Sequence, residues 1–178
     1  MITRSDSLEY LTEGVFINKD FADYIKSAQL TLYGTGGADI IGFGQKEFYI
    51  MEIDRNLANK IIIENHYSHK IYNATYIHLG VFIGEKLLGV LQFGYAMNPA
   101  SQEGVVKNTK IDEYLELNRM WLDDKALRNS ESRAISYAIK YIKRKFNGKI
   151  KWIQSFADER CNCYGIVYQA SNFKYYGE

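Results

Sequence analysis

Two apolar runs separated by two residues constrain the fold of this chain more than any other feature. Tyr76–Ile83 and Lys86–Phe93 are rich in aliphatic and aromatic side chains, and Gly84-Glu85 lies between them. This spacing is typical of a β-hairpin, because glycine readily adopts the backbone angles that a tight turn needs. We therefore expect an antiparallel pair of strands in the middle of the chain, around which the other elements pack.

Segments on both sides of the hairpin predict a sheet with flanking helices. Some carry strand-like apolar patterns, and others carry apolar residues at helical spacing. Their order along the chain indicates an α/β or α+β domain. The expected strands are residues 47–53, 114–122, 151–156 (a buried one) and 173–176, and the expected helices are residues 55–65, 132–146 and about 162–170.

Residues 1–46 are an N-terminal extension or the first elements of the fold, and residues 47–178 form the main domain. The glycines of the first part are not followed by Gly-Lys-Ser/Thr, so they predict loops and not a phosphate-binding loop. The segments expected there are short helices at Leu8–Leu11 and Phe21–Leu32 and glycine-rich turns at Gly34–Asp39 and Gly42–Gly44.

Composition indicates a folded protein of a reducing cytoplasm. Hydrophobic residues make up 47% of the chain and there is one proline, which argues against disorder. No run of about 18 apolar residues predicts a membrane span, and Met1–Tyr10 lacks the pattern of a secretory signal. Cys161 and Cys163 are too few for a disulfide framework. We expect a cytoplasmic location and no membrane partner.

The formal net charge of +1 conceals an uneven distribution. Lys125–Lys151 holds nine basic residues and one acidic residue, whereas the rest of the chain holds thirteen basic and twenty acidic residues. A local excess of +8 can hold the phosphates of a cofactor or of a nucleic acid. The alternative is an ordinary solvated helix face.

Three segments give the chain a resemblance to the N-acetyltransferase (GNAT) fold. They are the hairpin Gly80–Leu91, the strand Leu117–Leu122 with the loop and helix after it, and the segment Asp158–Phe173. The resemblance implies a mixed, mostly antiparallel sheet flanked by helices. One departure is clear, because Arg128–Ala134 replaces the glycine-rich pyrophosphate loop of that family.

The combination and order of four short motifs resembles the Mom family of bacteriophage DNA-modification proteins, over about residues 47–178. The motifs are His66-Tyr67, Leu117-Asn-Arg119, Asn129-Ser-Glu-Ser-Arg133 and Asp158 followed by Tyr168. The resemblance implies conversion of adenine N6 in double-stranded DNA to a carbamoylmethyl (acetamido) group, which protects phage DNA from restriction. A phage or prophage protein of this kind would act in the host cytoplasm.

The resemblance also implies catalytic residues, namely His66, Tyr67, Asp158 and Tyr168. A histidine titrates near neutral pH, so it can act as a base or bind a metal. In GNAT enzymes a tyrosine at the place of Tyr168 protonates the departing thiolate. The family further implies iron, with His66, Asp158 and Tyr168 as its ligands. The structural alternatives are a surface-loop histidine and a tyrosine that packs in the core.

Cofactor contacts are expected where the helix at residues 132–146 begins. Asn129, Ser130 and Ser132 are good N-cap residues, and the amides of a first helical turn attract anions. Arg133 adds positive charge, and the resemblance adds Arg119 as a further contact. The expected cofactor is acetyl-CoA or a related acyl donor. An ordinary capped helix is the alternative.

Several tyrosines suit an enzyme that must unstack a base to reach its amine. Tyr67, Tyr72, Tyr76 and Tyr95 lie in or beside the expected central cleft. Two other functions stay open: a GNAT-type acyltransferase that acts on a small or protein amine, and an inert GNAT-like module that binds DNA. The oligomeric state also stays open, with a homodimer as one candidate.

Overall fold

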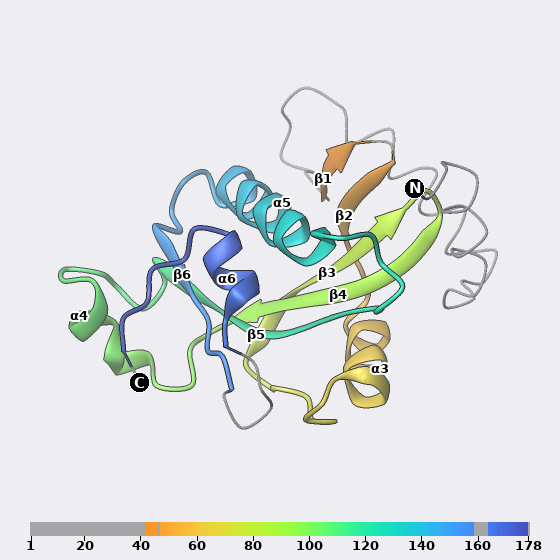
Figure 1. Ribbon diagram of the computed structural model, residues 1–178. Coiled ribbons are helices and arrows are strands. Elements are labelled where there is room, and N and C mark those ends of the chain that lie inside the picture. Colours follow the sequence, from red (N-terminus) through yellow and green to blue (C-terminus); the bar gives the residue numbers. More distant parts are fainter. Residues whose placement is uncertain (1–41, 46, 159–163, 178) are drawn as a thin grey trace.

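A computed structural model of the chain describes residues 42–45, 47–158 and 164–177. In this part the strands form one six-stranded sheet in the order β1-β2-β3-β4-β5-β6 (Figure 1). Neighbouring strands are antiparallel, except that β6 runs parallel to β5. The strands are β1 (Gly42–Gln45), β2 (Phe48–Glu52), β3 (Thr75–Ile83), β4 (Lys86–Gly94), β5 (Tyr114–Leu122) and β6 (Trp152–Gln154).

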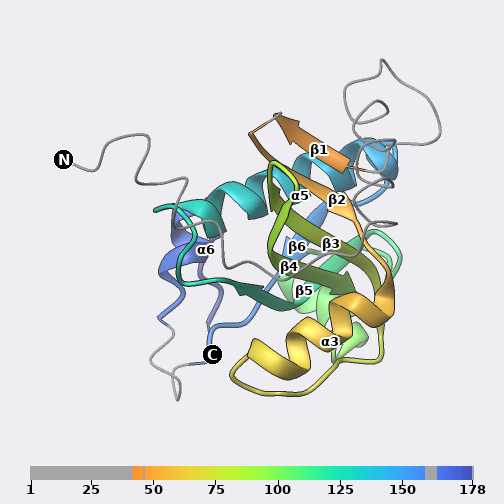
Figure 2. The same ribbon diagram turned by 90° about the vertical axis from the view of Figure 1, so that its right-hand side faces the viewer.

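Helices cover both faces of this sheet, so the expected mixed, mostly antiparallel architecture is confirmed (Figure 2). One helix, α3, contacts β3, β4 and β5, while α5 packs on the other face against β1 and β2. None of the helices in the described ranges is long and apolar enough to cross a membrane. The helices are α3 (Arg55–Asn65), η2 (Pro99–Ser101), α4 (Gln102–Val105), α5 (Ser130–Lys145) and α6 (Ile166–Ala170).

Each face of the sheet has its own hydrophobic core, because strand side chains alternate between the two faces. Leu79 and Val81 point toward α5, and Phe82 packs on the α3 side against Ile61 and Ile62. Burial of apolar surface contributes about 25 cal/mol per Å², so the core on each face stabilises the fold. The sheet is therefore a rigid central layer on which functional side chains are fixed.

The hairpin and the helix before it are confirmed. The turn places Gly84 at φ +58°, in the left-handed region that glycine tolerates, and Tyr49 donates a hydrogen bond to its carbonyl at 2.7 Å. The helix α3 has the expected bounds. It begins at Asp54, whose carboxylate accepts hydrogen bonds from the backbone N–H groups of Asn56 and Leu57.

The expectation of a glycine loop at Gly42–Gly44 is wrong, because these residues belong to strand β1. β1 pairs with β2, and Gly44 lies so close to that strand that an added Cβ would sit 2.4 Å from the Cα of Tyr49. Glycine at this position therefore permits strand pairing and does not signal a loop. The helices and the turn expected before residue 42 lie outside the described residues.

The C-terminal expectations are partly wrong. The expected strand at residues 151–156 shortens to β6, which is half-buried because it lies at the edge of the sheet. Residues 173–176 form no strand, and the Tyr175 side chain is 82% exposed. The helix expected from about residue 162 is α6, and its described part begins at Ile166. The short helices η2 and α4 were not expected, since their segment shows no apolar period.

Candidate functional site

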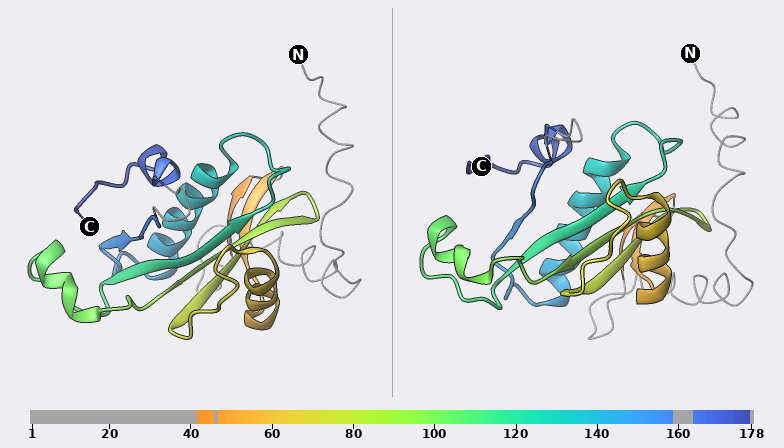
Figure 3. Two further views of the ribbon diagram at one scale, coloured as in Figure 1. Left: turned by 60° about the horizontal axis from the view of Figure 1, so that its bottom comes forward. Right: turned by 90° about the horizontal axis from the view of Figure 1, so that it is seen from below.

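The two parallel strands β5 and β6 pair over only three residues each. Tyr114–Glu116 lies opposite Trp152–Gln154, and the chain after β6 then leaves β5 toward α6 (Figure 3). Ser155 Oγ donates one further hydrogen bond to the carbonyl of Leu117 at 3.1 Å. Within the described ranges no strand pairs with the remainder of β5 on this side. The backbone edge of β5 after Glu116 is thus not engaged by the sheet.

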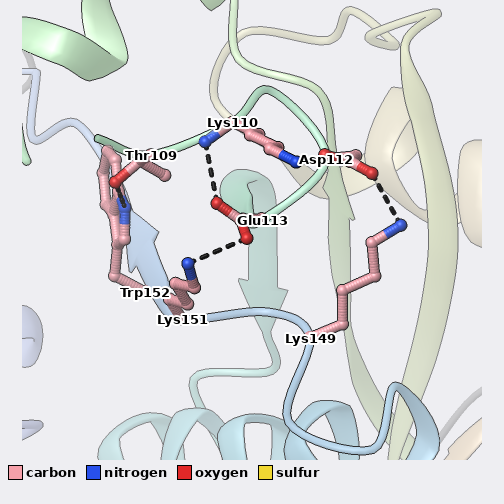
Figure 4. Close-up of polar contacts among 7 residues, drawn as sticks. All are labelled: Thr109, Lys110, Asp112, Glu113, Lys149, Lys151 and Trp152. Atoms are coloured by element: carbon pink, nitrogen blue, oxygen red, sulfur yellow. Dashed lines mark hydrogen bonds and ion pairs between the residues drawn. The ribbon is translucent and has the colours of Figure 1, made fainter. Parts of the chain in front are cut away.

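Polar contacts fix the place where the two strands meet (Figure 4). They join the loop before β5 to the segment between α5 and β6, and they use two lysines of the basic segment. These lysines therefore carry structural ion pairs. The contacts are Lys149 with Asp112 (2.7 Å), Lys151 with Glu113 (2.8 Å) and the Trp152 indole N–H with Thr109 Oγ1 (3.2 Å).

A β-bulge lies at Asn118, two residues beyond the end of the β5–β6 pairing. Gln92 of β4 pairs with Arg119 and Phe93 pairs with Leu117, so Asn118 is the extra residue on β5. A bulge re-aims the side chains around it and is common beside active sites. Here it brings Glu116, Asn118 and Arg119 close together near the unpaired edge of β5.

Glu116 is a buried carboxylate, with 5% of its surface exposed. It accepts hydrogen bonds from the backbone N–H of Met97 at 3.3 Å, Asn118 Nδ2 at 2.9 Å and Gln154 Nε2 at 2.9 Å. No lysine or arginine in the described part of the chain forms an ion pair with it. Buried charge is costly unless it is hydrogen-bonded, so these donors are what make the carboxylate tolerable.

The Asn118 side chain is 8% exposed, and its two polar atoms differ in their partners. Its Nδ2 donates to Glu116 and to the backbone carbonyl of Tyr95, at 2.9 and 3.2 Å. Its Oδ1 is buried and has no hydrogen-bond partner among the described residues. An unsatisfied buried acceptor of this kind costs about 1–3 kcal/mol.

Arg119, expected to contact the cofactor, is bound to the loop that follows α3. Its Nε donates to the carbonyl of Lys70 at 3.0 Å, and its guanidinium lies 5.9 Å from the centre of the Tyr72 ring. Burial and the nearby Glu116 carboxylate raise the pKa of Tyr72, while Arg119 lowers it. The arginine therefore joins β5 to this loop on the α3 side of the sheet.

His66 ends α3 and is 6% exposed. Burial lowers its pKa to about 4, with further lowering by the positive charge of Arg119 and by His69. The imidazole is therefore neutral near pH 7. Its Nδ1 accepts a hydrogen bond from the backbone N–H of Ser68 at 3.1 Å, so we assign the proton to Nε2. His66 thus presents an N–H donor beside the Tyr67 ring, whose centre is 4.3 Å away.

This tautomer does not fit the expected iron site. A metal needs a nitrogen lone pair, but Nδ1 of His66 is occupied by Ser68 and Nε2 carries the proton. Iron held by His66, Asp158 and Tyr168 therefore stays a prediction from resemblance.

Asp158 and Tyr168 lie on the chain after β6. Asp158 lies four residues beyond the end of β6 at Gln154. Tyr168 is on α6 as expected, and it is half-buried against the α5-side core with its ring 5.5 Å from that of Phe173. The structure thus groups His66 and Tyr67 with Arg119, and it gives Tyr168 a packing role on the α5 side.

The first turn of α5 lacks the N-cap side-chain hydrogen bond of an ordinary capped helix. Asn129 occupies the N-cap with φ +67°, and its side chain makes no hydrogen bond to the first turn. Ser130 is buried, and Ser132 Oγ donates back to the carbonyl of Asn129 at 3.2 Å. The expectation that these side chains cap the helix is therefore not met. Without such a cap, the first-turn amides can hold an anion.

Arg133 extends away from the first turn of α5 toward β1 and β2. Its guanidinium lies 4.4 Å from the centre of the Phe48 ring and 3.3 Å from Gln45 Oε1. Arg144 and Lys140 lie over Phe43 in the same way. No acidic side chain in the described ranges pairs with these three cations. We call Arg133, Lys140 and Arg144 the basic face of α5.

Glu116 is the site residue that the sequence reasoning missed. Its signal was present, because it is the one carboxylate in the otherwise mostly apolar run Tyr114–Leu122. The bulge at Asn118 gave no such signal, since it depends on the register with β4. Tyr72 was expected only as a stacking residue, and it proves to contact Arg119.

Comparison with solved structures agrees with the fold. A crystal structure of a probable acetyltransferase superposes with a TM-score of 0.51 over 72% of this chain and 91% of that chain, at 10% sequence identity. At this identity the likeness concerns the fold alone. The expected acetyltransferase-like architecture is thus confirmed.

Sequence comparison gives information on relatives as well as on the fold. The chain is 55% identical over 138 residues to the methylcarbamoylase mom of Escherichia phage Mu. The match covers 78% of this chain and 57% of that protein's length. Residues 47–178 match the Mom protein family, the same range over which the resemblance was seen. On these grounds the chain belongs to the Mom protein family.

Proposed function

We propose that this protein is a DNA-modifying transferase that converts adenine N6 to a carbamoylmethyl (acetamido) group and thereby protects phage DNA from restriction. The observation that carries this proposal is the 55% identity to a protein named methylcarbamoylase. The site supports it, because the Arg119 guanidinium lies close enough to the neutral imidazole of His66 to lower its pKa, and Arg119 and the buried Glu116 carboxylate both act on Tyr72.

Acetyl-CoA or a related acyl donor is the proposed cofactor. Its phosphates would lie at the start of α5, where the first turn lacks a side-chain cap and Arg128 is exposed. An amide-containing arm can hydrogen-bond to the β5 backbone beyond Glu116, which no described strand occupies. The fold of the acetyltransferase neighbour is compatible with this placement.

The chemistry calls for strong electrostatic help, because the N6 lone pair of adenine is delocalised into the ring. Carbamoylmethylation joins N6 to the methylene carbon beside the amide, while the leaving group of the donor departs from that carbon and N6 gives up one proton. N–H donors that are fixed in a water-poor site would polarise the amide carbonyl next to that carbon. Nε2–H of His66 and the guanidinium of Arg119 are such donors on the α3 side. Tyr67, Asp158 and Tyr168 remain proposed catalytic residues from the family resemblance.

Double-stranded DNA is the proposed partner. Reaching N6 requires the adenine to leave the base stack, and exposed aromatic side chains favour such unstacking. Tyr76 and Tyr95 are both 44% exposed with ring centres 5.2 Å apart, beside a cavity of about 430 Å³. The basic face of α5 supplies cations for the phosphates, and no acidic side chain in the described ranges pairs with them.

Nucleoside mass spectrometry tests the proposal. The chain is expressed in a bacterial host, and plasmid DNA is digested to nucleosides. We expect a carbamoylmethylated deoxyadenosine that vector-only cells lack. Folded protein with deoxyadenosine unmodified would contradict the proposal. If the purified protein instead acylates small amines from acetyl-CoA without DNA, the alternative acyltransferase function would replace it.

A further inference from the structure

We propose that the side-chain oxygen of Asn118 is the acceptor that recognises the amino group of the substrate base. This inference rests on the proposed function and names the group that selects adenine by its N6 amine. The ligand class is a nucleobase with an exocyclic amine, which donates N–H hydrogen bonds. Glu116 is the positioning residue that holds Asn118 in the required orientation.

The orientation of the Asn118 amide follows from its donors. Both N–H groups of Nδ2 have acceptors, namely a carboxylate oxygen of Glu116 and the carbonyl of Tyr95. A flipped amide would place its oxygen against these two oxygens. Oδ1 is therefore the polar atom of Asn118 that is still available to a ligand. It is buried and has no hydrogen-bond partner in the described part of the chain.

Hydrogen bonding to Glu116 also makes this oxygen a stronger hydrogen-bond acceptor. Donation from an amide N–H to a carboxylate polarises the amide and strengthens its oxygen as an acceptor. An acceptor of this kind binds an amine, whereas it repels the carbonyl oxygen that guanine or thymine presents. The pair Glu116–Asn118 therefore matches the donor side of adenine.

The position of Asn118 distinguishes it from the other unpaired acceptors. Two more buried side-chain oxygens lack partners among the described residues, on Gln92 and Gln102. Gln92 lies inside the sheet, where its Nε2 donates to Asn59 at 2.9 Å, and Gln102 begins the short helix α4. Asn118 is the one at a β-bulge beside the unpaired edge of β5.

Binding of short oligonucleotides tests the inference without requiring turnover. The probes are single-stranded thymidine oligonucleotides with one central adenine or one central purine, which lacks only the amine. We expect the wild-type protein to bind the adenine probe at least about tenfold more tightly, as one well-made hydrogen bond to a buried acceptor provides. Asn118→Ala should bind both probes equally.

Gln92→Met is the matched control, since it removes a buried unpaired acceptor on the neighbouring strand β4, opposite Arg119. It should keep the preference for adenine over purine even if its stability falls. Preference retained in Asn118→Ala would overturn the inference. So would a wild-type protein that binds both probes equally.

A measurement on the wild-type protein alone covers the case in which Asn118→Ala fails to fold. Deoxyadenosine should compete with the adenine probe, and purine deoxyriboside should compete about tenfold less well. Equal competition would overturn the inference. Modified adenine in plasmid DNA combined with equal competition would leave the proposed function standing and refute this inference. A preference for adenine without any modified DNA would refute the function instead.

Discussion

At the residue scale, His66 shows how burial decides a chemical role. Its sequence context suggested a base or a metal ligand, yet the Ser68 N–H bond to Nδ1 leaves it as a neutral donor. Because desolvation opposes the imidazolium, the folded protein resists protonation of this residue. The same burial that shapes the site therefore makes the fold sensitive to acid.

We predict a specific loss of stability in mild acid. His66 has its ordinary pKa of 6.5 in the unfolded chain and a pKa of about 4 in the folded protein. Its contribution is complete above pH 6.5 and is lost as the pH falls toward 4, by up to about 3 kcal/mol. Urea unfolding at pH 7 and pH 5 measures the loss. His66→Asn, which keeps an acceptor for Ser68, should reduce it.

His69→Asn is the control for this experiment, because His69 is exposed and its φ of +49° suits asparagine. It should keep most of the wild-type difference between pH 7 and pH 5, because His69 is the smallest of the three causes that lower the pKa of His66. An unchanged difference in His66→Asn would show that the acid sensitivity has another source.

Glu116 is predicted to be essential for both the site and its stability. In Glu116→Gln an amide N–H would face the donors of Met97, Asn118 or Gln154. We expect the free energy of unfolding to fall by about 1–3 kcal/mol and the preference for adenine to weaken. Chemical denaturation and the oligonucleotide assay measure the two effects. Glu113→Gln, at the half-buried partner of Lys151 just before β5, should leave the preference for adenine unchanged.

At the element scale, the helices and strands that were predicted correctly are those whose own sequence carries an apolar period or a turn. α3, the hairpin and β5 matched their expected ranges to within a residue or two, because each carries its own period or turn. β1 and residues 173–176 were misjudged, since strand pairing depends on a distant partner. The bulge at Asn118 and the separation of β5 from β6 arise in the same way, so the centre of the candidate site was not predictable.

The contact between β4 and β5 is predicted to tolerate no added methyl group at Gly89. A Cβ there would lie 2.4 Å from the carbonyl oxygen of Trp121. Gly89→Ala should therefore push the strands apart and lower the free energy of unfolding by about 1–3 kcal/mol. Gly104→Ala in α4, where a Cβ meets open space, should leave it unchanged or slightly raised. Equal effects in both variants would contradict this account.

At the scale of the whole molecule, the near-zero net charge is the sum of unlike parts. Of the nine basic residues in Lys125–Lys151, three lysines form ion pairs, and the three cations of the basic face of α5 have no acidic partner among the described residues. The aromatic rings of Phe43 and Phe48 hold these cations in place. A protein of near-zero net charge thus places three cations side by side on one face of α5.

We predict that this surface binds the DNA backbone. Arg144→Glu should weaken binding to duplex DNA of any sequence and reduce the slope of affinity against salt concentration by about one for each lost phosphate contact. Fluorescence anisotropy across a salt series measures both. Lys60→Glu on the exposed side of α3 is the matched control. Equal weakening by the two variants would mean that the basic face has no special role.

The most direct test of the proposed function measures modified adenine in plasmid DNA from cells that express wild-type protein, Glu116→Gln or Glu113→Gln. We predict carbamoylmethylated deoxyadenosine with wild-type and Glu113→Gln protein, and a loss of about tenfold or more with Glu116→Gln at equal folded protein. Unmodified DNA with the wild-type protein, or full modification with Glu116→Gln, would contradict it.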